Sequence, residues 1–167
     1  MHEMTKQNLK NAFSGESQAH MKYLAFADTA EKEGKVNVAR MFRAIAYAEQ
    51  VHAINHLKVL SGVGKTAENL QSAMEGENFE VAEMYAVYDV DAKFQGEKEA
   101  EKSIHYALQA EKIHAVMYQK AKETVIAGQD ITLKEVYICP ICGYTHEGEP
   151  EDFCPVCKAK KSIFKKF

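Results

Sequence analysis

The chain has 167 residues, of which 46% are hydrophobic and 27% charged, a composition typical of a globular protein large enough to bury a core. Its formal net charge of −3 is too small to favour binding to nucleic acid or to a membrane surface. No apolar run approaches the roughly 18 residues of a membrane-spanning helix. The first residues, Met1 to Thr5, also lack the pattern of a secretory signal. We therefore expect a cytoplasmic protein without a membrane segment.

Helix-forming residues dominate the first 130 positions, where alanine, glutamate and lysine are frequent and proline is absent. Apolar residues recur there at helical spacing, and Gly34 and Gly96 mark two breaks between helices. Thr66 is expected to be the N-cap of the third helix. The expected helices cover residues 5–33, 36–60, 66–94 and 97–126. A linker over 129–135 and a short strand over 136–138 are expected to follow.

The first and second pairs of helices repeat the same pattern. Glu49-x-x-His52 in the second helix recurs as Glu111-x-x-His114 in the fourth. Glu16 in the first helix recurs at nearly the same offset as Glu77 in the third. One Glu-x-x-His is weak evidence, but a duplicated set of Glu and Glu-x-x-His is the ligand set of a carboxylate-bridged two-metal site in a four-helix bundle.

The positions of these residues along the helices agree with a shared site. Gly34 lies midway in the sequence between Glu16 and His52. Gly96 lies next to the midpoint between Glu77 and His114. At a rise of about 1.5 Å per residue, each Glu is level with the His of its partner helix, about 27 Å from the turn. Oxygen and imidazole ligands suit iron better than copper or a closed zinc site.

One further carboxylate breaks the symmetry of the repeat. Glu80 follows Glu77 by one helical turn and therefore shares its helix face, whereas the equivalent position in the first half is Ala19. We expect Glu80 to be a seventh ligand on one side of the site only. His20 lies one turn after Glu16, where it could support the ligands from beside the site, but an ordinary surface histidine is the favoured interpretation.

All four cysteines lie near the C-terminus, in two Cys-x-x-Cys pairs separated by a short segment. The pairs are Cys139 with Cys142 and Cys154 with Cys157, and this spacing is strong evidence for a four-thiolate metal site. Spacing alone does not distinguish iron from zinc. Gly143 after the first pair favours a rubredoxin-type iron site, but Lys158 stands where the second pair would have glycine.

Several motifs together give the chain a resemblance to the rubrerythrin family. They are Gly15-Glu16-Ser17-Gln18-Ala19, the two Glu-x-x-His motifs, Gly76-Glu77-x-x-Glu80, Glu83-Met84-Tyr85 and the two Cys-Pro-x-Cys pairs. The resemblance implies a mostly α fold, with a ferritin-like four-helix bundle over 1–130 and a small rubredoxin-like metal-binding domain over 135–167. It also implies a cytoplasmic non-haem di-iron peroxidase that reduces hydrogen peroxide to water in defence against oxidative stress. Its electrons would come from rubredoxin or an NAD(P)H:rubredoxin reductase.

The resemblance also assigns site residues. It implies a pair of irons and one further iron in each chain, with zinc as a possible substitute. The di-iron ligands would be Glu16, Glu49, His52, Glu77, Glu80, Glu111 and His114, with Cys139, Cys142, Cys154 and Cys157 at the single iron. Glu80 and His52 would exchange at one iron. Tyr23 and Tyr85 match tyrosines close to the di-iron centre, although packing in the core is the alternative for both.

The connection between the two hairpins is short for a bundle made by one chain. The distance from the end of the second helix to the start of the third is about 27 Å by helix rise, whereas the connecting segment reaches at most about 25 Å when fully extended. We therefore expect a domain-swapped homodimer. The alternative functions are an O2-reducing oxidase or ferroxidase, an iron-storage protein of the ferritin type, and a non-enzymatic zinc-ribbon scaffold.

Overall fold

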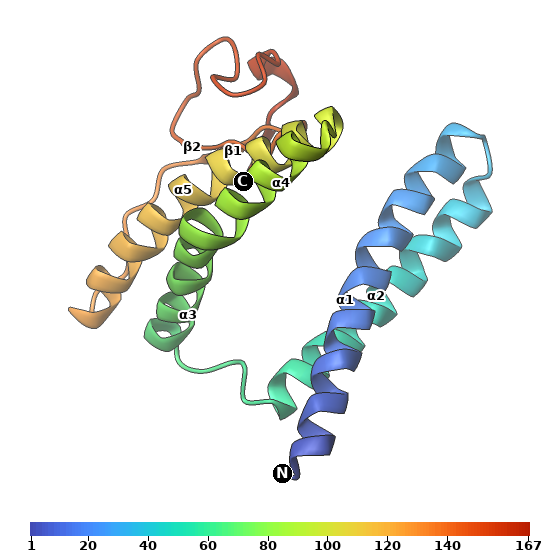
Figure 1. The fold of residues 1–167 in the computed structure, drawn as a ribbon, viewed down its shortest axis with the longest axis vertical. Coiled ribbons are helices and arrows are strands. Elements are labelled where there is room, and N and C mark those ends of the chain that lie inside the picture. Colours follow the sequence, from blue (N-terminus) through green and yellow to red (C-terminus); the bar gives the residue numbers. More distant parts are fainter. The chain divides into compact units, whose positions relative to one another are not determined.

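The computed structural model describes all 167 residues, which form two compact units, Met1–Gly64 and Lys65–Phe167 (Figure 1). Each unit contains one half of the sequence repeat, and the second also contains the cysteine-rich segment. None of the helices combines the length and the apolar character that a membrane span requires.

The first unit is a hairpin of two antiparallel helices, α1 (Glu3–Lys32) and α2 (Val36–Val59). The turn between them contains Gly34 at a φ of +74°, in the left-handed region that glycine adopts without strain. The predicted limits of both helices agree closely with those observed. The buried side chains of the hairpin are all alanines, namely Ala27, Ala30, Ala39, Ala46 and Ala53.

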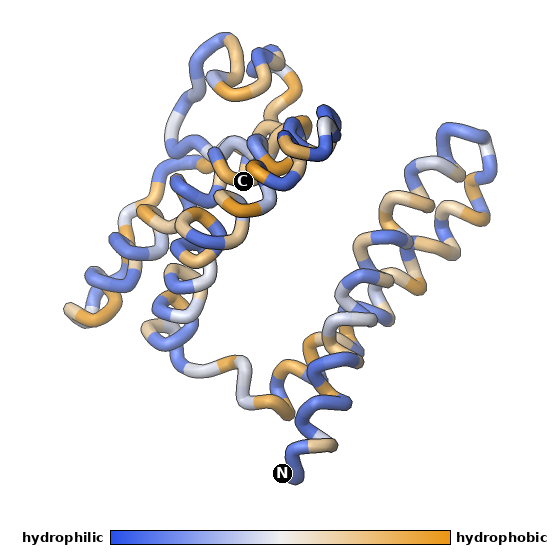
Figure 2. The backbone as a smooth tube through the Cα atoms, in the orientation of Figure 1, coloured by the Kyte–Doolittle hydropathy of each residue, from blue (hydrophilic) through white to orange (hydrophobic).

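The hairpin therefore leaves its larger apolar side chains exposed. These side chains include Met21, Phe26, Met41, Ile45, Val51 and Ile54, each at least 38% exposed. Apolar stretches alternate with polar ones along both helices (Figure 2). Because its fully buried side chains are all small while large apolar side chains stay exposed, this hairpin offers a candidate contact surface for an apolar partner.

The second unit begins with a helical segment that the sequence predicted as one continuous helix. It consists of α3 (Thr66–Phe79), the π-helical turn η1 (Glu80–Met84) and α4 (Tyr85–Gln95). The prediction of Thr66 as N-cap is wrong, because the cap is Lys65, whose backbone N–H donates to Glu68 Oε2 at 2.7 Å. Gly96, at a φ of +74°, then turns the chain into α5 (Lys98–Ile126).

The cysteine-rich segment follows an extended linker, as predicted, and packs against α5. It contains a three-stranded antiparallel sheet in the order β2-β1-β3 and a short 3-10 turn, η2. The strands are β1 (Val136–Ile138), β2 (Thr145–Glu147) and β3 (Lys165–Lys166), and η2 spans Lys161–Ile163. Three of the four cysteines form the core of this segment, with Tyr106 of α5 packed against them.

Candidate metal centres

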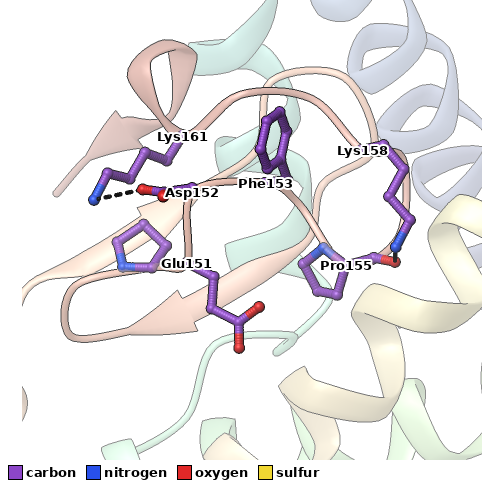
Figure 3. Close-up of a pocket in the computed structure, with 7 residues that line it drawn as sticks. Glu151, Asp152, Phe153, Pro155, Lys158 and Lys161 are labelled. Atoms are coloured by element: carbon purple, nitrogen blue, oxygen red, sulfur yellow. Dashed lines mark hydrogen bonds and ion pairs between the residues drawn. The ribbon is translucent and has the colours of Figure 1, made fainter.

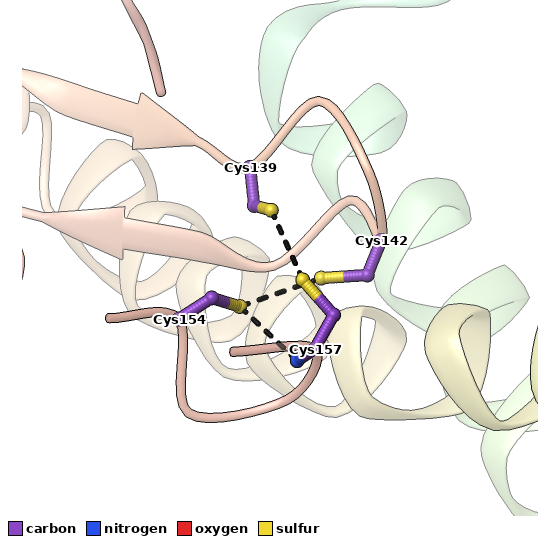
Figure 4. Close-up of side chains that lie close together, drawn as sticks. All are labelled: Cys139, Cys142, Cys154 and Cys157. Carbon is purple, nitrogen blue, oxygen red and sulfur yellow. Dashed lines mark hydrogen bonds between the residues drawn. The ribbon is translucent and has the colours of Figure 1, made fainter. Parts of the chain in front are cut away.

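The four cysteines converge on one point between two chain turns (Figure 4). Cys139 Sγ lies 3.5 Å from Cys157 Sγ, and Cys142 Sγ lies 3.5 Å from Cys154 Sγ, with all four present as free thiols. Four sulfurs placed tetrahedrally about 2.3 Å from a metal ion would be about 3.8 Å apart. The cluster therefore needs only a slight expansion to hold a metal in a four-thiolate site.

The surroundings of the sulfurs suit thiolate ligands. Burial raises the pKa of Cys142 well above its usual range, and a cation nearby would favour its ionised form. Burial opposes ionisation of Cys154 too, but backbone N–H groups of Cys157 and Val156 outweigh it and lower the pKa of that thiol. A bound cation would favour the thiolate form of all four sulfurs.

The first unit contains one half of the duplicated ligand set. Ligand atoms of Glu16, Glu49 and His52 all lie within 4.8 Å of one another. His52 Nδ1 is 3.0 Å from Glu49 Oε2, a contact within one helical turn. The spacing Glu-x-x-His thus places a carboxylate and an imidazole side by side, and the α1–α2 hairpin brings Glu16 level with them, as the spacing from Gly34 predicted.

The second unit contains the other half of the duplicated ligand set, in similar geometry. We call the group in the first unit the first half-site and the group in the second unit the second half-site. Ligand atoms of Glu77, Glu111 and His114 again lie within 4.8 Å of one another. His114 Nδ1 is 2.7 Å from Glu111 Oε2 and 3.9 Å from Glu77 Oε1. The other oxygen of Glu77, Oε2, is buried without a hydrogen-bond partner. A buried oxygen without a partner is costly, and a metal ion would supply the missing interaction.

Glu80 lies beside this second group rather than inside its closest cluster. Burial raises the pKa of Glu77 to about 8, and the neighbouring carboxylates of Glu111 and Glu80 add to the effect. Burial, followed by the charge of Glu111, also raises the pKa of Glu80. Crowded carboxylates repel one another unless a cation binds between them, so the geometry of this half-site fits a divalent metal.

The two tyrosines have different surroundings. Burial raises the pKa of Tyr85, and the charges of Glu80, Glu111 and Glu77 raise it further, which places its hydroxyl near the second half-site. Tyr23 packs with two aromatic rings of the first unit, at 6.2 Å from Phe26 and 6.0 Å from Phe42 between ring centroids. The role of Tyr23 beside the metal centre remains a prediction.

Two residues take positions that the sequence did not indicate. His20 is half-buried, and its Nδ1 lies 2.7 Å from the carbonyl oxygen of Ala46, so it links α1 to α2 and is not an ordinary surface residue. Thr145 Oγ1 lies 2.7 Å from His114 Nε2, across the contact between the cysteine-rich segment and α5. No motif signals Thr145, because its contact is made between segments far apart in the sequence.

The lysines near the C-terminus are largely paired and do not form a free cationic patch. A surface pocket there is lined by Phe153, Pro155, Lys158 and Lys161, among others (Figure 3). Lys161 Nζ lies 3.3 Å from both Glu149 and Asp152, and Lys158 Nζ donates to the carbonyl oxygen of Pro155 at 3.1 Å. We see no feature of a binding site in this pocket beyond these local pairs.

Two family models match the chain, one for each part of the predicted architecture. The model for rubrerythrin matches residues 7–122, and the model for the rubredoxin-like domain of rubrerythrin matches residues 137–165. The chain is 43% identical to rubrerythrin-2 of Clostridium acetobutylicum, covering 98% of this chain and 97% of that protein. It is 34% identical to nigerythrin of Nitratidesulfovibrio vulgaris, covering 96% of this chain and 85% of that protein.

A solved structure of nigerythrin in its fully reduced, all-ferrous state also resembles this chain. The TM-score is 0.57 at 32% sequence identity, covering 98% of this chain and 86% of the nigerythrin chain. The fold and the donor sets thus define an iron-binding oxidoreductase with a ferritin-like helical part and a rubredoxin-like part. The chain belongs to the rubrerythrin family. The predicted fold class is confirmed, whereas the domain limits 1–130 and 135–167 remain predictions.

Proposed function

We propose that the chain is a non-haem di-iron peroxidase that reduces hydrogen peroxide to two molecules of water with two electrons and two protons. The observation that carries the proposal is the presence of both Glu and Glu-x-x-His groups and a four-cysteine cluster in one chain. Two bound irons would supply one electron each to the peroxide oxygens. The four-cysteine iron would be the point at which external electrons enter.

The carboxylates suit a centre that changes its charge. The five glutamates of the proposed set carry five negative charges when ionised; they are Glu16, Glu49, Glu77, Glu80 and Glu111. Five negative charges lie between the four positive charges of two ferrous ions and the six of two ferric ions. Both oxidation states are therefore close to charge balance, which keeps the cost of moving between them low. Glu80 and His52 remain our candidates for ligands that exchange as that charge changes.

We propose iron at all three metal positions, with zinc as a possible substitute. The nigerythrin structures similar to this chain are described as fully reduced, all-ferrous and mixed-valent states, so that relative holds redox-active iron. The ligand atoms of this chain fit the same chemistry, since carboxylate and imidazole bind ferrous iron and thiolates bind iron in rubredoxin-type sites.

The electron donor would be a rubredoxin or an NAD(P)H:rubredoxin reductase acting at the four-cysteine site. We also propose a cytoplasmic location, because four cysteines that converge on one point as a metal site suit a reducing compartment. We propose no nucleic acid or membrane partner.

We propose that the active assembly is a domain-swapped homodimer. Each half-site offers only one histidine and two close carboxylates, which are too few ligands for a metal pair. The α1–α2 hairpin exposes the large apolar side chains described above, and a second helical hairpin would cover them. The segment between Val59 and Thr66 is short for a connection along the length of a bundle. The second hairpin would therefore come from another copy of the chain.

The decisive experiment is stopped-flow absorption spectroscopy on anaerobically reduced, iron-loaded protein mixed separately with hydrogen peroxide and with O2. We expect the visible thiolate–iron band to return quickly with peroxide and slowly with O2. Faster reoxidation by O2 would make the protein an oxidase, and no such band would indicate zinc in the cysteine site. Iron uptake far beyond three ions per chain would instead support storage.

The matched variant is Glu111→Ala, which removes one carboxylate from the second half-site and leaves the cysteines intact. The variant should retain its thiolate–iron band but lose fast reoxidation by peroxide. Fast reoxidation in this variant would overturn the proposed role of the helical half-sites.

A further inference from the structure

The side chain of Thr145 forms a hydrogen-bonded connection between the cysteine-rich segment and His114. Its Oγ1 lies 2.7 Å from His114 Nε2 and donates to the carbonyl oxygen of Gly143 at 3.1 Å. Thr145 is only 4% exposed and is the one polar residue of the chain that is buried. A hydroxyl buried in this way needs defined partners, and these two groups satisfy it.

The direction of the hydrogen bonds follows from the number of protons available. A hydroxyl has one proton to donate, and Thr145 gives it to the carbonyl of Gly143, which can only accept. Thr145 Oγ1 must therefore accept from His114, so the Nε2 of His114 carries a proton. In the neutral imidazole the lone pair is then on Nδ1.

Nδ1 is the ring nitrogen that faces the carboxylates, at 2.7 Å from Glu111 Oε2 and 3.9 Å from Glu77 Oε1. Without a metal, the 2.7 Å contact requires a proton shared between Nδ1 and Glu111, and a bound metal ion would take the place of that proton. We propose that Thr145 is a positioning residue that holds His114 with its Nε2 protonated and its Nδ1 lone pair directed toward the metal site. The metal-binding part of this inference rests on the proposed function, whereas the protonation pattern does not.

The equivalent histidine of the first half lacks this support. His52 contacts Glu49 through Nδ1 at 3.0 Å, but no hydrogen bond is formed by its Nε2. Within one chain, the two halves of the repeat therefore differ in the hydrogen bonds of the histidine, and His52 provides an internal comparison.

Thr145 is also tied to the four-cysteine site through the backbone. It follows Cys142 closely in the sequence and pairs in register with Ile138, the residue just before Cys139. Gly143, whose carbonyl accepts the proton of Thr145, donates its own N–H to the carbonyl of Cys139 at 2.9 Å. Small metal sites of this kind are ordered by their metal. Filling the cysteine site should therefore fix Thr145 and, through it, His114.

The test compares two variants. Thr145→Val keeps the shape of the side chain but removes the hydroxyl, whereas Thr145→Ser keeps the hydroxyl and removes the methyl group. Thr29→Val is the matched control, because Thr29 is an exposed residue of α1 whose hydroxyl bonds only the carbonyl of Ala25. Each full-length protein receives one equivalent of Zn2+ for the cysteine site and is then titrated with Co2+. We expect Thr145→Val to bind Co2+ at the second half-site about 10- to 100-fold more weakly, as is typical when the partner of a ligand histidine is removed. Thr145→Ser and Thr29→Val should stay near the wild type.

A second readout does not depend on metal affinity or on peroxide chemistry. In wild-type protein labelled with 15N-histidine, NMR should show Nε2 of His114 protonated even when the ring is neutral, with no such restriction for His52. A neutral His114 that carries its proton on Nδ1 would overturn the inference. Equal Co2+ affinity in Thr145→Val and wild type would do the same. If Thr145→Val fails to hold zinc in its cysteine site, the Co2+ affinity of Thr145→Ser and the 15N-histidine NMR spectrum of the wild type still test whether Thr145 positions His114.

Discussion

Gly143 and Lys158 adopt the same left-handed backbone conformation, with φ values of +76° and +63°, although only one of them is glycine. Each follows the second cysteine of its pair, and each donates its N–H to the carbonyl of the first cysteine, at 2.9 Å and 3.0 Å. The two cysteine pairs therefore form equivalent turns. Lysine in place of glycine in the second pair therefore raises the conformational free energy of the turn but leaves its geometry unchanged.

Replacing Lys158 by glycine should stabilise the metal-loaded cysteine segment. A non-glycine residue in the left-handed region costs about 1–2 kcal/mol, and the greater freedom of glycine in the unfolded chain offsets part of this gain. We expect a net increase of about 0.5–1 kcal/mol in the free energy of unfolding, within the usual range for such changes. Denaturant unfolding followed by the thiolate–metal absorption measures it.

Lys160→Gly is the control for this prediction, since Lys160 has a φ of −68° that any residue adopts without strain. The control should leave the protein equally or less stable. A Lys158→Gly protein less stable than the wild type would show that the turn carries no strain.

The metal-free protein should become less stable as pH rises from about 5 to about 8. Burial, with help from Glu111 and Glu80, raises the pKa of Glu77 from its ordinary value of 4.5 to about 8. The folded state therefore holds a proton at Glu77 that the unfolded chain releases near pH 4.5, so stability is lost as pH rises through this window. Because the group is partly exposed, we expect a loss of about 1–3 kcal/mol.

Urea unfolding at several pH values between 5 and 8 measures this loss, with Glu77→Gln as the comparison. Glutamine cannot ionise, so the difference in stability between the wild type and the variant should shift in favour of the variant as pH rises. A difference that stays constant over this range would contradict the raised pKa of Glu77.

The sequence predicted which of these side chains lie close together because their geometry is local. Glu111 and His114 lie one helical turn apart whatever surrounds them, and a symmetric hairpin places Glu77 level with them by helix rise alone. The cysteine pairs are equally local, since each turn is closed by backbone hydrogen bonds between neighbours. Periodicity and spacing capture relationships of this kind.

Other features could not be predicted because they depend on tertiary contacts or on a small change in helix geometry. The π-helical turn that begins at Glu80 replaces an i to i−4 hydrogen bond by the bond from the Tyr85 N–H to the Glu80 carbonyl. No residue type in the sequence predicts a π-helical turn at this position, although such turns are frequent at functional sites. The bonds of His20 and Thr145 likewise join segments that are distant in the sequence.

Glu80 should affect the second half-site more than its neighbour Glu83 does. Both lie in the π-helical turn, but Glu80 is half-buried near Glu77 and Glu111, whereas Glu83 is exposed. Replacing Glu80 by alanine removes one negative charge from the cluster, which should lower the pKa of Glu77 and weaken metal binding. We expect a loss of roughly 10-fold or more in Co2+ affinity, corresponding to about 1.4 kcal/mol.

Glu83→Ala provides the matched control on the same turn and should bind Co2+ as the wild type does. Titration followed by visible absorption gives both affinities. Equal losses in the two variants would indicate that the turn itself, rather than the carboxylate of Glu80, supports the site.

Removing the cysteine site should weaken metal binding at the second half-site. In Cys139→Ser the thiolate–metal band should be lost, and the segment that holds Thr145 against His114 should become less ordered. We expect Co2+ affinity at the second half-site to fall in the same direction as in Thr145→Val. Unchanged affinity in Cys139→Ser would show that Thr145 is held by the sheet alone.

Mixing two inactive variants provides a direct test of the domain-swapped dimer. His52→Ala damages the half-site of the first unit, whereas His114→Ala damages that of the second. In a swapped heterodimer of these two chains, one centre contains both substitutions and the other contains neither. In an unswapped heterodimer, each centre contains one substitution and both remain damaged.

Co-expression with two different affinity tags isolates the heterodimer for this comparison. If the swap occurs, the heterodimer should recover about one intact di-metal centre per dimer, and peroxide reduction should return to roughly half of the wild-type rate per dimer. The two variant homodimers, purified in the same way, should show neither. The result distinguishes the two arrangements because an intact centre can arise only when its two hairpins come from different chains. A heterodimer as inactive as its parents would exclude the swap while leaving the metal ligands unchallenged.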